Sequence, residues 1–99
     1  MIEVRQTTLF REWLDSLADQ RAAARIAQRI VRLQAGLIGD ARPVGDGVSE
    51  LRVDYGPGYR VYFVRRGQVL IILLWGGDKW SQRRDIVRAK MLAAELEVE

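Results

Sequence analysis

The sequence predicts an α+β fold of one domain, residues 1–99, in which helices pack on one face of an antiparallel meander sheet. Two observations favour this fold. Apolar residues recur at helical spacing in residues 10–37 and in residues 86–96, while residues 48–75 hold three β-rich runs separated by short turns. Strands joined by short turns pair most readily as antiparallel neighbours, and 99 residues can bury one modest core. The expected order of elements is βααβββα.

The N-terminal half predicts one strand and two amphipathic helices. Residues 2–6 are β-rich and predict a short strand that can join a sheet edge. Thr7 or Thr8 can cap the first helix, and Asp19 can cap the second, which Gly36 and Gly39 then end. The apolar stripes expected to be buried are Phe10, Trp13, Leu14 and Leu17 in the first helix, and Ile26, Ile30, Leu33 and Leu37 in the second.

The C-terminal half predicts three strands and one helix. Residues 38–47 are rich in turn formers and predict a loop. The strands are expected at 48–53, 59–64 and 69–75, and the last is apolar on both faces, as in a covered central strand. The run from Gly76 to Lys79 predicts a polar turn, after which Ser81 caps a helix that reaches about Leu96.

Composition excludes several kinds of chemistry. The chain has no cysteine and no histidine, so a thiolate nucleophile, a cysteine zinc site and the usual general base near neutral pH are all excluded. We expect no cofactor and no metal. No apolar run is long enough to span a membrane, and the N-terminus lacks the apolar core of a signal peptide, so we expect no membrane association and a cytoplasmic location.

The positive charge is concentrated in the predicted strands and the turn after them. Residues 51–90 hold seven arginines and two lysines against three aspartates, a net charge of +6. Arginine binds phosphate bidentately and stacks on bases, so RNA is the expected partner, with an acidic protein as the competitor and a merely solvated basic surface as the third interpretation. A row of arginines in the second helix, at 21, 25, 29 and 32, has the same alternatives.

Strand alternation gathers candidate site residues on one face. Arg52, Arg60 and Tyr62 lie on the phase opposite the apolar residues of their strands, and Lys79 follows the neighbouring strand. Two arginines and a lysine can hold a phosphodiester and stabilise negative charge that develops on it. Tyr62 can donate a proton or stack on a base. The alternatives are a cross-strand pair of Arg52 with Glu50 or Asp54, a pair of Arg60 with a C-terminal acid, and ordinary sheet packing for Tyr62.

The start of the last helix adds further candidates. Backbone N–H groups at a helix N-terminus favour anions, and Gln82 lies in that first turn. Trp80 follows Lys79 and can stack on a base or pack. Asp85 can act on a proton, cap the helix or pair with Arg88. The predicted catalytic residues are Arg52, Arg60, Tyr62, Lys79 and Asp85, and the predicted RNA-binding residues are Arg52, Arg60, Lys79, Trp80, Gln82 and Arg83.

Several motifs resemble those of one bacterial toxin family. They are F-x-x-W-L-x-x-L at 10–17, R-I-x-x-R-I at 25–30, the run from Gly39 to Arg52, Y-G-P-G-Y-R-V-Y-F at 55–63, L-L-W-G-G-D-K at 73–79, and Gln82 with Asp85-Ile86. Together they cover nearly the whole chain in order. The chain resembles the addiction-module killer proteins, which are HigB-like (Gp49-like) members of the RelE/ParE toxin superfamily.

This resemblance implies the toxin of a type II toxin–antitoxin system, neutralised by a cognate antitoxin, in such systems usually a helix-turn-helix protein. It implies a ribosome-dependent mRNA interferase, an endoribonuclease that cuts mRNA on the ribosome and inhibits translation, and that meets DNA only through the antitoxin. Arg60 matches the strand arginine of RelE-type enzymes, while Lys79 and Arg52 match basic positions loosely. Asp85 stands where those enzymes have tyrosine. ParE-like relatives instead inhibit DNA gyrase without cutting RNA, which is the alternative function.

Overall fold

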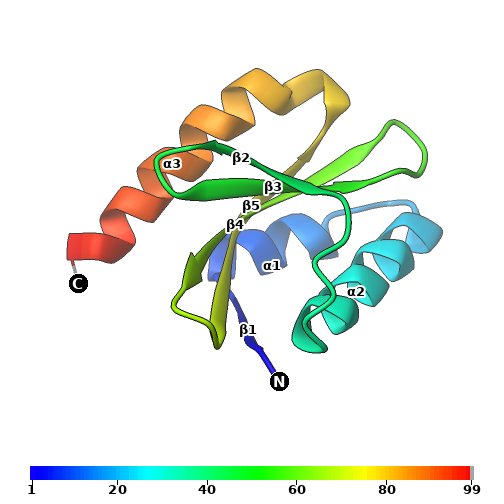
Figure 1. Cartoon of the computed structure of the whole chain (residues 1–99). Helices are drawn as coiled ribbons and strands as arrows, with labels where there is room; N and C mark the ends of the chain where they lie inside the picture. Colours follow the sequence, from blue (N-terminus) through cyan, green and yellow to red (C-terminus); the bar gives the residue numbers. More distant parts are fainter. Residues whose placement is uncertain (99) are drawn as a thin grey trace.

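The computed structural model describes residues 1–98, and the side chains of residues 1–96, as one sheet between two helical layers (Figure 1). The strands are β1 (Glu3–Gln6), β2 (Ala41–Gly45), β3 (Val48–Val53), β4 (Tyr59–Arg66) and β5 (Leu70–Asp78). The helices are α1 (Thr8–Asp15), α2 (Gln20–Gln34), the 3₁₀ turn η1 (Lys79–Ser81) and α3 (Gln82–Val98). The predicted α+β class is confirmed.

The five strands lie in the order β1-β5-β4-β3-β2. Strands β3 to β5 form the predicted antiparallel meander, β2 extends it by one more antiparallel strand, and β1 lies at the opposite edge, parallel to β5. The prediction of a loop over residues 38–47 is wrong in part, because Ala41–Gly45 forms the other edge strand. Pro43 disfavours a strand in the sequence pattern, so the strand was not predicted. Both Pro43 and the shift of register before Gly45 are tolerated at an edge, where one side of the backbone needs no partner.

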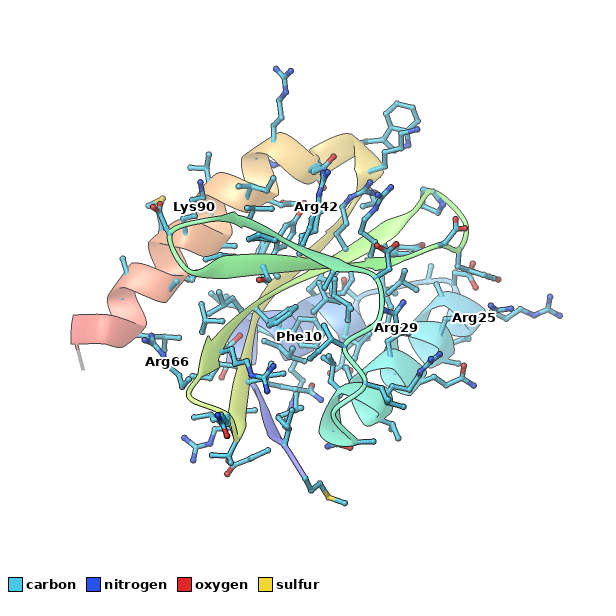
Figure 2. The ribbon with its side chains drawn as sticks, viewed as in Figure 1. Phe10, Arg25, Arg29, Arg42, Arg66 and Lys90 are labelled. Carbon is cyan, nitrogen blue, oxygen red and sulfur yellow. The ribbon has the colours of Figure 1, made fainter. Side chains whose placement is uncertain are left out.

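Helices cover both faces of the sheet, so the prediction of helices on one face is wrong. Helices α1 and α2 cover one face, where Phe10 points into the layer between helix and sheet (Figure 2). Helix α3 covers the opposite face, where Ala89 and Ala93 pack on Val48 and Leu74. The reason is that the second face is also apolar over much of its area, and small residues of α3 let the helix lie close to it. None of the described helices is both long and apolar enough to cross a membrane.

Most predicted helix ends are found. The Thr7 side chain accepts a hydrogen bond from the Phe10 backbone N–H at 3.1 Å, and Asp19 caps α2. The 3₁₀ turn η1, which precedes α3, is capped by Asp78, which accepts from the backbone N–H groups of Trp80 and Ser81. Ser81, the predicted cap of the third helix, directly precedes α3, and its hydroxyl donates to the Asp85 carboxylate. Leu37 lies beyond the end of α2 and is 57% exposed, so its predicted burial is wrong.

The glycine pair at 76 and 77 continues β5 and does not form the predicted turn. An extra residue in β5 opposite β4 places Trp75 across from Tyr62 and Gly76 across from Val61. A Cβ at Gly76 would lie 2.1 Å from the Trp13 ring. A Cβ at Gly77 would lie 1.8 Å from the Asp85 carboxylate on the other face. Each glycine therefore admits a large or charged side chain against the sheet.

We expect Gly76→Ala to lower the free energy of unfolding by at least about 1–3 kcal/mol, because the methyl group overlaps the Trp13 indole. Chemical denaturation measures the change. The matched control introduces Gly76→Ala into a Trp13→Leu background, where the added methyl group has room. An equal loss in both backgrounds would contradict the assigned contact.

Candidate functional site

Two rows of side chains cross the sheet beneath the first turns of α3. Aligned positions on β2, β3, β4 and β5 form the first row, which is Arg42, Glu50, Tyr62 and Trp75. The second row, two residues further along β3 and β4, is Arg52, Arg60 and Gly77. The rows bring together the predicted Arg52, Arg60 and Tyr62 because paired positions on antiparallel strands point to the same face.

Glu50 is the buried centre of this arrangement. Its carboxylate is fully buried and accepts from Arg60 Nε at 2.7 Å and from Gln82 Nε2 at 2.9 Å. A longer ion pair of 3.4 Å joins its second oxygen to Arg42, which lies between β2 and α3 (Figure 2). A buried carboxylate is stable only when it is paired and hydrogen-bonded. Glu50 thus ties two strands and the first residue of α3 to one point.

Arg60 is held in one orientation by two acceptors. Only 7% of its side chain is exposed, and beyond Glu50 its Nη1 donates to the Gly58 carbonyl at 2.9 Å. A guanidinium has five N–H donors, so three remain after these two contacts. The alternative interpretation of Arg60, a pair with a C-terminal acid, is not found among the described side chains, where its partner is Glu50 on the adjacent strand.

Arg60 lies at the wall of a hollow of about 200 Å³, which we call the site hollow. Arg52 lies opposite Arg60 in the strand register, is exposed and forms no ion pair with a described residue. Two carboxylates, Asp40 and Asp54, also line the site hollow. The hollow therefore offers donors that suit a phosphate and acceptors that suit a hydroxyl or an amino group.

A second hollow, of about 400 Å³, lies at the start of α3. It is lined by Lys79, Trp80, Ser81, Gln82, Arg83 and Arg84. Trp80 is 82% exposed, and the Lys79 ammonium lies 5.8 Å from the centroid of its ring. An exposed aromatic ring among cations is suited to base stacking beside phosphate contacts. Lys79 also lies near Gly58, at the edge of the site hollow, so the two hollows adjoin.

Tyr62 is fully buried, and its hydroxyl has no hydrogen-bond partner among the described residues. Burial raises the pKa of Tyr62 well above its ordinary value, and the carboxylates of Glu50 and Asp85 raise it further. The nearby cations Arg60 and Arg42 offset only part of this shift. Tyr62 therefore keeps its proton, which suits a donor and not a base.

Asp85 is a buried carboxylate whose two oxygens are both occupied. One accepts from Trp75 Nε1 at 2.9 Å, and the other accepts from the Ser81 hydroxyl. Arg88, one of its proposed partners, instead lies over the Trp75 ring. Asp85 thus fastens α3 to β5 through Gly77, where a side chain would displace it. No group of acidic side chains that could hold a metal ion occurs in the described part of the chain.

Sequence reasoning missed three residues of this site: Glu50 as the central acceptor, and Asp40 and Asp54 at the site hollow. Glu50 was considered only as a partner of Arg52. Alternation places it on the correct face, but only the register of β3 against β4 shows that it reaches Arg60. The catalytic and RNA-binding roles of the predicted residues stay predictions.

We expect Tyr62→Phe to unfold with a free energy equal to that of the parent at neutral pH, or up to about 1–3 kcal/mol higher, because the lost hydroxyl has no partner. The raised pKa stabilises the folded parent below about pH 10, where an unfolded tyrosine titrates, and this stabilisation is lost as pH rises through the folded pKa. Between pH 7 and pH 11 the free energy of unfolding should therefore decrease less with rising pH for Tyr62→Phe than for the parent. Equal slopes would contradict the shift.

The fold is similar to that of a solved toxin–antitoxin protein. A chain of the toxin–antitoxin complex RelBE2 from Mycobacterium tuberculosis superposes with a TM-score of 0.65 and 20% identity, over 79% of this chain and 98% of that one. Such low identity supports the fold alone, which is RelE-like. No protein-family model matches the sequence.

One curated protein is similar to the chain in sequence. An uncharacterized protein of Haemophilus influenzae is 52% identical over 95 residues, which is 96% of each chain. Identity at this level over nearly the full length shows common descent and a shared fold. The chain belongs to the same protein family as this Haemophilus influenzae protein, and it has the RelE-like α+β fold.

Proposed function

We propose that the chain is the toxin of a type II toxin–antitoxin pair, of the HigB-like kind, and that it cleaves mRNA on the cytoplasmic ribosome. The observation that carries the proposal is the Arg60 guanidinium, which Glu50 fixes and which belongs to a residue lining a hollow shared with Arg52. A rigid arginine beside a free one suits a phosphodiester better than a merely solvated surface would, because no ordering is needed on binding.

The proposed reaction uses the substrate's own nucleophile. The ribose 2′-oxygen attacks the adjacent phosphorus while the bond to the 5′-oxygen breaks, so one proton leaves the 2′-hydroxyl and one is gained by the 5′-oxygen. Arg60, Arg52 and Lys79 stabilise the negative charge that builds up on the phosphate oxygens. Trp80, Gln82 and Arg83 hold the neighbouring nucleotides by stacking and by polar contacts.

The candidate groups for proton transfer are of two kinds, those accessible from the site hollow and those that are buried. Asp40 and Asp54 line the site hollow, so either carboxylate is placed to accept the 2′-hydroxyl proton. Tyr62 keeps its proton but is fully buried, so it does not transfer that proton directly to the substrate. Asp85 serves as a positioning residue, because both of its oxygens are already occupied. A ribosomal group remains the source of the proton for the leaving oxygen.

Arg60→Ala alone is a poor test, because it leaves Glu50 buried without its closest cation and costs about 3–5 kcal/mol of stability. We therefore test Arg52→Ala/Lys79→Ala, which changes two exposed side chains. Expression without antitoxin should arrest growth for the parent and far less for this variant, with new mRNA 5′ ends reduced at least about tenfold, which corresponds to ~1.4 kcal/mol.

The control for this experiment is Arg11→Ala/Arg65→Ala, which removes the same charge from exposed positions outside the site. It should arrest growth and cut RNA as the parent does. Loss of activity in both variants would assign the effect to net charge. Unchanged cleavage by Arg52→Ala/Lys79→Ala would overturn the proposed site.

We propose a cognate antitoxin of the helix-turn-helix type as the protein partner. The support is the basic surface around Lys79, Arg83 and Arg84, which form no ion pair with a described residue and which an acidic antitoxin segment would cover. We expect a small helix-turn-helix reading frame beside the gene to restore growth when co-expressed. Pull-down at increasing salt should weaken the complex, and undiminished capture in high salt would contradict a charge-based contact.

A ParE-like toxin that blocks DNA gyrase is the second candidate. The observation that favours it is the burial of Tyr62 and Asp85, which removes two of the predicted proton-transfer groups from direct contact with a substrate. The same induction experiment separates the two functions. New codon-linked RNA ends support the nuclease, whereas DNA breaks that depend on gyrase, with intact mRNA, support the alternative.

A further inference from the structure

Helix α2 carries a row of arginines that the proposed reaction does not use. Between Gln20 and Gln34 it has four arginines and no acidic residue. Arg21, Arg25, Arg29 and Arg32 lie on one side of the helix, and successive steps of four residues advance about 6 Å along it. This row, which we call the α2 ridge, lies on the sheet face opposite α3.

The charge of the ridge is not neutralised within the described chain. Arg21, Arg25 and Arg32 form no ion pair with any described residue, and the nearest acid in sequence, Asp19, is used as the helix cap. In Figure 2, Arg29 turns toward the chain that leaves α2. Arg29 donates to the carbonyl of Arg52 at 2.8 Å, which links the ridge to the end of β3 at the site.

The ridge borders a hollow of about 360 Å³ that is separate from the site. Its lining includes Arg21, Arg25, Gln28 and Tyr55, with the Arg25 guanidinium 5.1 Å from the Tyr55 ring centroid. Tyr55 belongs to the turn between β3 and β4, and the preceding residue, Asp54, lines the site hollow. The two hollows therefore lie on either side of one turn.

We infer that the α2 ridge binds the sugar–phosphate backbone of RNA, as a contact independent of cleavage. An acidic protein is the competing ligand, but protein interfaces are built around buried apolar anchors. The exposed residues between the arginines here are Ala24, Ala27, Gln28 and Val31, and one valine that is 62% exposed is not a buried anchor. Arginine forks on a regular row, with one guanidinium pre-oriented on a tyrosine, match repeated phosphates instead.

The test measures binding without cleavage. The full-length chain is titrated into a fluorescent 20-nucleotide RNA whose 2′-hydroxyls are all methylated, and the dissociation constant is followed by anisotropy from 50 to 300 mM KCl. Each phosphate contact contributes about 0.7 to the slope of log affinity against log salt for a single strand. Arg21→Ala/Arg25→Ala should therefore reduce the slope by about 1.4.

Two further variants make the result specific. Arg21→Lys/Arg25→Lys keeps the charge and should retain the parent slope, while Arg11→Ala/Arg65→Ala removes equal charge elsewhere and should also retain it. A ridge variant with the parent slope would falsify the inference, as would an equal drop in the Arg11/Arg65 control. A parallel titration uses poly-glutamate as a probe for an acidic protein. If the ridge variant lost binding to poly-glutamate but bound RNA as the parent does, the ligand would be a protein and the inference would be overturned.

This inference stands or falls separately from the proposed nuclease. In the same titration, Arg52→Ala/Lys79→Ala tests the site, and its effect on the slope should add to that of the ridge variant. A chain that binds through the ridge but never cuts RNA would retain the inference and overturn the nuclease. A chain that cuts RNA but whose RNA binding does not depend on the ridge would support the nuclease and overturn the inference about the ridge.

Discussion

The buried carboxylate of Glu50 is the constraint on which the rest of the site depends. It joins Arg60 on the neighbouring strand to Gln82 at the start of α3, and more weakly to Arg42. A fully buried charge must be compensated, so these groups have little freedom to move apart. The sheet, the last helix and the orientation of the candidate phosphate-binding arginine are therefore set together.

Buried pairing and free charge divide the arginines into two groups with different physical roles. Arg60 is held by acceptors and lines a hollow, so it supplies a fixed direction for recognition. Arg52 and the arginines of α2 are exposed or bonded only to carbonyls, so they supply charge that salt screens readily. A surface of this second kind gives fast capture of a polyanion, and the fixed group of the first kind gives selectivity.

The sequence was sufficient for the meander, the caps at Thr7 and Asp19, and the shared face of Arg52, Arg60 and Tyr62, because each depends on local spacing. It was insufficient where distant segments meet. The edge strand at Ala41–Gly45 contains Pro43, and the place of α3 on the second face depends on how closely small residues let it approach. Gly76 and Gly77 suggest a turn in the sequence, whereas in the structure they leave room for the side chains of Trp13 and Asp85, which come from distant segments. Glu50 could be identified only from strand register.

A double-mutant cycle on Glu50 and Arg60 tests this dependence most directly. Free energies of unfolding would be measured for the parent, for Glu50→Gln, for Arg60→Met and for the double variant. Each single variant should lose about 3–5 kcal/mol, because it leaves one buried partner without the other. The double variant should lose less than the sum of the two by at least about 2 kcal/mol. Additive losses would contradict the claim that this pair organises the site.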